Sequence, residues 1–228
     1  MRPSRRDLLT VSGVATALAA APAMAQSTRA APKYDPKPLA LDLKKVKGLS
    51  EKILTSHYEN NYLGAVKRLN AIGEQIAALD YDKAPVFTVN GLKREELIAM
   101  NSMLLHELYF ASMGEPNQPG KALSDAIARD FGSMDRWRAE FTAMGKAEGG
   151  GSGWVLLTYS PRDKRLVNSW AADHTMTVAG GEPLLALDMY EHAYHMDFGA
   201  KAADYVNAFM GTINWSNADR LFGQRRSN

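Results

Sequence analysis

Histidine is scarce in this chain, and its placement is the first feature that could carry chemistry. The 228 residues include five histidines and no cysteine. Without thiols, the sequence excludes disulfides, thiolate catalysis and cysteine-held zinc or iron–sulfur sites. Any metal must therefore be held by imidazole nitrogens, carboxylates or backbone oxygens, which suit manganese, iron or zinc.

Three of the histidines and one aspartate stand out as candidate metal ligands. His57 and His106 each lie in a stretch of helical periodicity. Asp188 and His192 are four residues apart, where a predicted strand gives way to a helix, so their side chains can point the same way. Burying an unpaired polar group costs about 2–7 kcal/mol, and burying a charge costs more. A shared metal ion would offset that cost for all four side chains.

The ligand types alone leave the reaction open. Three neutral imidazoles and one carboxylate leave a coordination position free for water or hydroxide, which suits one-electron iron or manganese chemistry. A zinc-dependent hydrolase uses the same ligand types. A non-haem iron oxygenase needs two histidines and one carboxylate, so the third histidine counts against it.

The first 25 residues are predicted to be an export signal. A basic start with Arg5 and Arg6 is followed by an apolar stretch, 8–21, and by the small-x-small triplet Ala23-Met24-Ala25. The apolar stretch is shorter than the about 20 residues that a membrane helix needs, so we expect no stable membrane span. The arginine pair resembles a twin-arginine export signal. We therefore expect cleavage of residues 1–25 and a periplasmic or otherwise exported mature protein.

The charge balance argues against a nucleic-acid partner. The formal net charge is +2, and removal of residues 1–25 takes away three arginines and one aspartate, which leaves a neutral mature chain. A neutral chain lacks the basic excess on which binding to a polyanion depends.

The N-terminal half of the mature chain is predicted to be helical. Residues 26–48 hold several prolines and are expected to form an extended arm. Apolar residues at three- and four-residue steps predict a helix over 50–79. A second helix is expected over 93–112, with Leu97 and Leu104 on its apolar face. The intervening residues 80–91 contain a proline and an Asn-Gly pair and are expected to form a loop.

The C-terminal half is predicted to combine a small sheet with helices. Strands are expected over 154–159, 166–170 and 184–188, and helices over 121–131, 135–145, 200–209 and 216–222. The fold class is therefore α+β. An N-terminal helical hairpin domain, 49–116, precedes a C-terminal α/β domain, 117–228, with a small three-stranded antiparallel sheet.

Several segments resemble the iron/manganese superoxide dismutases. They are Ser56-His57-Tyr58 through Asn70, Leu105-His106 through Phe110, Gly151-Ser152-Gly153-Trp154, Asp188-Met189-Tyr190-Glu191-His192-Ala193-Tyr194 and Ile213-Asn214-Trp215. The similarity runs from about residue 35 to residue 222, and the string beginning at Asp188 is its most specific part.

This resemblance implies one iron or manganese ion per subunit, held between the two domains. His57, His106, Asp188 and His192 would be the ligands, and a solvent molecule would take the fifth position. Superoxide would be the substrate, converted to dioxygen and hydrogen peroxide. The resemblance does not decide between iron and manganese.

The resemblance also implies a set of residues around the metal. Trp154 matches an aromatic wall of the site, and Tyr58 is included among the expected catalytic residues. His174 is near the position from which some members present a glutamine or histidine to the metal-bound solvent, while Ser102 occupies the alternative position. We therefore expect His174 to be the partner of that solvent.

Two departures concern substrate access and proton delivery. The family usually has a gateway tyrosine where this chain has Ala65, and often has a histidine where it has Asn61. A metal-binding homologue with low activity is therefore an alternative to an efficient dismutase.

The resemblance further implies a homodimer. Glu191 matches the family residue that pairs with the metal-binding histidine of the other subunit, here His192. His195 replaces a tyrosine that contacts the family histidine across the interface. We therefore expect Asn61 and His195 to meet between subunits.

Overall fold

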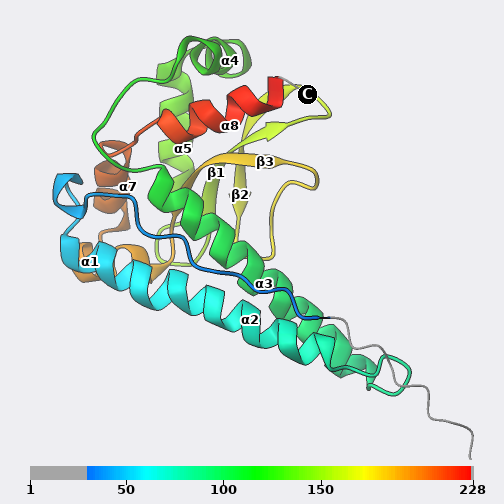
Figure 1. Ribbon diagram of the computed structural model, residues 1–228. Helices are drawn as coiled ribbons and strands as arrows, with labels where there is room; N and C mark the ends of the chain where they lie inside the picture. The colour runs from blue at the N-terminus through cyan, green and yellow to red at the C-terminus, as the bar shows by residue number, and fades with distance from the viewer. Residues whose placement is uncertain (1–29, 227–228) are drawn as a thin grey trace, which may run out of the picture.

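The computed structural model describes residues 30–226 and shows a helical hairpin beside a domain that contains a three-stranded sheet (Figure 1). The predicted fold class is confirmed. The predicted signal peptide, residues 1–25, lies outside the described residues. No helix within residues 30–226 is both long and apolar enough to cross a membrane.

The first predicted helix is present but contains a π-helical turn. It consists of α1, η2 and α2, which span Glu51–Ser56, His57–Tyr62 and Leu63–Ala77. Ser50 caps its start, because the Ser50 hydroxyl accepts a hydrogen bond from the Ile53 amide. A π turn inserts an extra residue into the helix and is frequent at functional sites. This turn begins at His57, and periodicity alone gave no sign of it.

The second helix begins earlier than predicted. Helix α3 spans Val86–Ala111, so the Asn90-Gly91 pair expected in a loop lies inside it. Pro85 directly precedes the helix, where its fixed φ and missing amide hydrogen are tolerated. The long packing contact between α2 and α3, visible in Figure 1, supplies the stability that the Asn-Gly pair lacks.

The buried face of α3 also differs from the predicted one. Leu97 and Leu104 were expected in the core but are 44% and 49% exposed, whereas Ala99, Met103 and His106 are buried. Helix α3 packs against both α2 and the sheet, so its orientation follows two neighbours rather than one apolar stripe.

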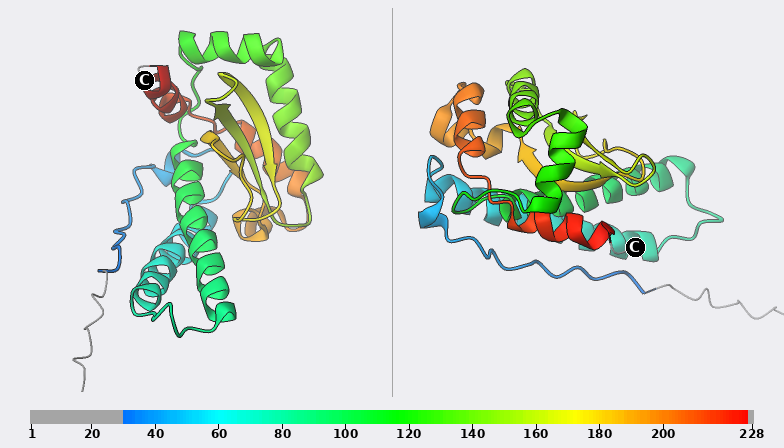
Figure 2. Two further views of the ribbon diagram at one scale, coloured as in Figure 1. Left: turned by 90° about the vertical axis from the view of Figure 1, so that its right-hand side faces the viewer. Right: turned by 90° about the horizontal axis from the view of Figure 1, so that it is seen from above.

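The C-terminal domain has the predicted elements, with small shifts at their ends. They are α4 (Lys121–Phe131), α5 (Met134–Ala147), β1 (Trp154–Ser160), β2 (Arg165–Ala171), β3 (Glu182–Asp188), η3 (Glu191–Ala193), α6 (His195–Phe198), α7 (Ala202–Met210) and α8 (Ser216–Arg226). The helix expected after Asp188 is the short 3₁₀ turn η3. The sheet is antiparallel with strand order β2-β1-β3, and Figure 2 shows helices on its flanks.

The central strand β1 fixes the relative positions of several site residues. Trp154, at its start, pairs with Ala171 of β2 on one side and with Asp188 of β3 on the other. Helix α5 packs closely against the sheet at Gly145, where an added Cβ atom would lie only 2.7 Å from Leu187 Cδ2. The fold therefore places the last residue of β3 beside the first residue of β1, deep in the core.

The arm runs along the helical hairpin as an extended segment, apart from the 3₁₀ turn η1, Leu43–Lys45 (Figure 1). The Asn70 side chain accepts a hydrogen bond from the Tyr34 amide and donates one to the Tyr34 carbonyl, each 2.8 Å long. The Tyr58 hydroxyl donates to the Lys37 carbonyl at 2.9 Å. Side chains of the first helix thus hold the arm in place.

Candidate metal centre

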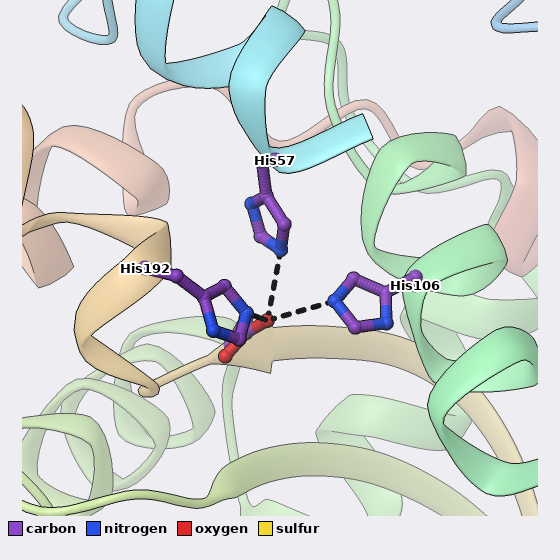
Figure 3. Close-up of side chains that lie close together, drawn as sticks. His57, His106 and His192 are labelled. Atoms are coloured by element: carbon purple, nitrogen blue, oxygen red, sulfur yellow. Dashed lines mark hydrogen bonds and ion pairs between the residues drawn. The ribbon is translucent and has the colours of Figure 1, made fainter. Parts of the chain in front are cut away.

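Four side chains that are distant in sequence converge in the core. His57 comes from η2, His106 from α3, Asp188 from the end of β3 and His192 from η3. Each offers one potential ligand atom, and these four atoms all lie within 4.8 Å of one another. Figure 3 shows the three imidazole rings approaching a common carboxylate from three directions.

The distances inside this cluster suit a single metal ion. Asp188 Oδ2 lies 3.1 Å from His57 Nε2, 3.2 Å from His192 Nε2 and 3.6 Å from His106 Nε2. Two ligand atoms that are each about 2.1 Å from one ion, at a right angle, are about 3 Å apart. The four atoms therefore have the spacing of one coordination shell.

The hydrogen bond of His106 leaves a free electron pair inside the cluster. Its Nδ1 lies 2.6 Å from the Ser102 carbonyl oxygen, which can only accept, so Nδ1 carries the ring hydrogen. The lone pair is then on Nε2, which is buried and has no hydrogen-bond partner within the described residues. A carbonyl on one ring nitrogen and a metal on the other is the usual arrangement of a metal-binding histidine. This orphaned nitrogen shows that the residues fit a bound metal.

The protonation states also suit metal binding. Burial lowers the pKa of His57 and lowers that of His106 to about 3, so both imidazoles are neutral. Burial alone would raise the pKa of Asp188. The nearby His192 and hydrogen bonds from His192 and His57 outweigh it, and hold the pKa of this carboxyl well below its usual range. The cluster thus offers neutral imidazoles and an ionised carboxylate, the forms that bind metals.

Neighbouring groups fix the Asp188 carboxylate and its backbone. The Tyr190 amide donates to Asp188 Oδ1 at 2.8 Å, which leaves Oδ2 for the cluster. The buried Tyr205 hydroxyl donates to the Asp188 carbonyl at 2.7 Å. The ring of Tyr109 packs 4.9 Å from that of His57. Sequence reasoning missed Tyr109 and Tyr205 as site residues, because neither is close in sequence to the residue that it contacts, His57 or Asp188.

His174 is at the edge of the cluster with a defined tautomer. The Trp154 Nε1 hydrogen is donated to His174 Nδ1 at 3.0 Å. Because an indole N–H can only donate, Nδ1 is the acceptor and a neutral His174 carries its hydrogen on Nε2. Burial lowers the pKa of His174, which favours this neutral form. The Asn101 side chain also donates to the His174 carbonyl at 2.6 Å, which ties the loop to α3.

His174 and Trp154 therefore lie beside the ligands, and their predicted catalytic roles stay predictions. The His174 ring is 6.0 Å from that of His106, and the Trp154 ring is 5.3 Å from it. Ser102 contributes through its carbonyl, with its hydroxyl 3.3 Å from His106 Nδ1. Tyr58 differs, because its hydroxyl is bonded to the arm, although its ring lies 5.9 Å from that of Phe110 beside His57. A catalytic role for Tyr58 stays a prediction.

The remaining predicted residues differ in how far they are exposed. Ala65 is buried and Asn61 is half-buried, while Glu191 and His195 are exposed on the surface of the single subunit. The structure thus leaves Glu191 and His195 accessible to a second chain.

Comparison with known proteins places this site in a family. Residues 119–221 match the family described as "Iron/manganese superoxide dismutases, C-terminal domain". The chain is 68% identical over 189 residues to "Superoxide dismutase [Fe]" of Cupriavidus metallidurans, covering 83% of this chain and 96% of the relative.

More distant relatives carry either metal in their names. Identity is 32% over 196 residues to "Superoxide dismutase [Mn] 1" of Halobacterium salinarum, covering 84% of this chain and 96% of the relative. It is 32% over 185 residues to "Superoxide dismutase [Fe]" of Aquifex pyrophilus, covering 78% and 85%. With the converging ligand cluster and the α+β fold, these matches show that the chain belongs to the iron/manganese superoxide dismutase family.

Proposed function

We propose that this protein is a superoxide dismutase that uses one iron or manganese ion per subunit, held by His57, His106, Asp188 and His192. The observation that carries the proposal is the unpartnered, buried lone pair of His106 Nε2, aimed into a cluster with an ionised carboxylate. A chain of this family with such a cluster has the donor set that the reaction requires.

The bound metal supplies one-electron chemistry, by which one superoxide is oxidised to dioxygen and the next is reduced to hydrogen peroxide with uptake of two protons. The protein must bind the ion, keep the ligands rigid and provide a proton path. The buried cluster and the hydrogen bonds from Tyr190 and Tyr205 serve the first two tasks.

His174 is the residue best placed to hold a proton near the reaction. Its Nε2 hydrogen is a donor because Trp154 occupies Nδ1. Trp154 therefore fixes the tautomer of His174, and Asn101 fixes the loop from which it projects. These contacts keep the proton on one defined atom beside the ligand cluster.

Ala65 and Asn61 bear on the rate rather than on the type of reaction. Alanine and asparagine at these positions offer fewer groups that could relay protons than the tyrosine and histidine that are frequent there in the family. The rate of superoxide consumption by the metal-loaded protein separates an efficient dismutase from a low-activity homologue, and zinc as the purified metal would support a hydrolase.

A homodimer completes the site in our proposal. The His192 side chain is 27% exposed, and no hydrogen bond of its Nδ1 occurs within residues 30–226. A metal-binding histidine usually donates its second ring hydrogen to a carboxylate or carbonyl. The exposed Glu191 of a second subunit supplies such a carboxylate, and contact between Asn61 and His195 across the interface accompanies it.

Export through a twin-arginine signal is the second part of the proposal. Its support is the arginine pair, the apolar stretch and the small-x-small triplet within residues 1–25. A route that carries folded proteins allows the metal to be inserted before export, and the mature enzyme then acts in the periplasm.

His106→Ala should abolish metal binding. Loss of a group that merely orients a ligand costs about 10–100-fold in metal affinity, so loss of the ligand itself should cost at least about 100-fold. Metal content by atomic emission and superoxide consumption should both fall to background. Leu104→Ala, an exposed change on the same helix, is the control and should behave as wild type. Full metal content in His106→Ala would remove this ligand from the site.

Trp154→Phe should lower turnover without loss of metal. The ring is kept but the hydrogen bond that sets the His174 tautomer is lost, so we expect a fall in kcat of about 10–100-fold, the range for a group that orients a functional residue. Pulse radiolysis measures the rate, and metal analysis verifies loading. An unchanged rate would show that the tautomer of His174 does not matter.

Glu191→Gln should weaken the dimer. The charged hydrogen bond to the His192 of the second subunit becomes a neutral one, so the subunit dissociation constant should rise about 10-fold or more. Sedimentation of residues 26–228 over a range of concentrations measures this constant. A monomeric wild-type protein would contradict the proposed assembly, and Glu59→Gln, an exposed change on η2, is the control.

Replacement of both Arg5 and Arg6 by lysine should block export. The signal would keep its charge and apolar stretch but lose the arginine pair that the receptor reads. Fractionation of cells that produce the full chain should then show the uncleaved protein in the cytoplasm. Export of the double variant at the wild-type level would exclude the twin-arginine route.

A further inference from the structure

Glu148 is a buried carboxyl group that the proposed mechanism does not use. It directly follows α5 and is only 8% exposed. Both of its carboxyl oxygens are fully buried, and neither has a hydrogen-bond partner within the described part of the chain. A buried carboxylate without a partner is costly, so the position calls for an explanation.

The carboxyl group packs under the turn that leads to Trp154. A Cβ atom on Gly153 would lie 2.5 Å from Glu148 Oε2 and 2.6 Å from the Ala171 carbonyl oxygen. Gly153 has a φ of 152°, where other residues are strained, and its carbonyl accepts a hydrogen bond from the Met189 amide at 2.9 Å. The carboxyl group thus lies where the turn 149–153 joins the sheet, against Gly153, which directly precedes Trp154.

The surroundings favour the neutral form of this group. Burial raises the pKa of Glu148 to about 8, and the negative charge of Asp188 adds to the effect. Within residues 30–226, Asp188 of β3 is the charged group that acts on it. The C-terminal end of α5 carries partial negative charge, which also disfavours a carboxylate there. At neutral pH the side chain is therefore a carboxylic acid.

We propose that Glu148 is a positioning residue, which as a neutral carboxylic acid holds the turn 149–153 against the sheet and so keeps Trp154 in hydrogen-bond contact with His174. This inference rests on the proposed function of His174. An ionised Glu148 cannot stay buried without a partner, so it must move or admit water, and the turn must move with it. Above its pKa, the protein loses both stability and the fixed tautomer of His174.

The sign of the pH effect follows from the raised pKa. A group that binds its proton more tightly in the folded state stabilises the fold at low pH, and this stabilisation is lost as the pH rises through the folded pKa. The stability that this group contributes should therefore fall as the pH rises from about 4.5, its unfolded pKa, to about 8, its folded pKa, and should stay level above that. For a chain of this size, the shift in Tm caused by this group should be on the order of 5 °C.

The test compares Glu148→Gln with wild type, both metal-loaded. The amide has the same shape and cannot ionise, so it should remove this group's share of the fall in Tm between about pH 4.5 and 8, and the loss of superoxide turnover as the pH rises through about 8. Glu148→Ala should reduce turnover already at pH 7 with metal retained, because the turn loses its support. Glu74→Gln, an exposed change on α2, is the matched control and should follow wild type at every pH.

Two results would overturn the inference. One is a change in Tm between about pH 4.5 and 8 that is the same in Glu148→Gln as in wild type. The other is an infrared difference spectrum, wild type minus Glu148→Gln at pH 6, that lacks the band of a protonated carboxyl. Both readouts are independent of catalysis. Absence of turnover in wild type would instead count against the proposed function and leave the stability result interpretable.

Discussion

The structure depends on the burial of one ionised carboxylate, Asp188, among three imidazoles. A charge in the core is tolerated only where it is paired and hydrogen-bonded. Here the pairing draws on four separate elements: η2, α3, β3 and η3. The hairpin and the sheet domain thus meet at a point where the polar side chains of each would lack partners without the other. A metal ion between them compensates the charge of Asp188.

Rigidity around this centre comes from groups that have no role in binding the ion. The carbonyl of Ser102 sets the tautomer of His106, and the Trp154 indole sets that of His174. The Tyr205 hydroxyl holds the backbone of Asp188. A ligand set becomes a catalyst only when such contacts fix which nitrogen bears a proton, and in this protein they come from β1, α3 and α7.

The sequence predicted the elements and the four converging residues well, and predicted their surroundings poorly. The strand that ends at Asp188 and the helices around His57 and His106 follow from periodicity. The exposure of Leu104 depends on the packing of α3 against two neighbours at once. The π turn at His57 and the early start of α3 at Val86 have no counterpart in the periodicity. The hydrogen bond from Tyr205 to the Asp188 carbonyl joins residues 17 positions apart, and no local pattern encodes it.

Anomalous X-ray scattering from crystals of the mature protein, measured at the iron and manganese absorption edges, tests the central claim most directly. A single ion held by the four ligands should give one strong peak per subunit, at iron or manganese, within about 2.0–2.2 Å of the nitrogens of the three histidines and of Asp188 Oδ2. The protein for these crystals is produced with both metals supplied. The absence of a peak among these four atoms, or a peak coordinated by other residues, would contradict a metal site at this cluster.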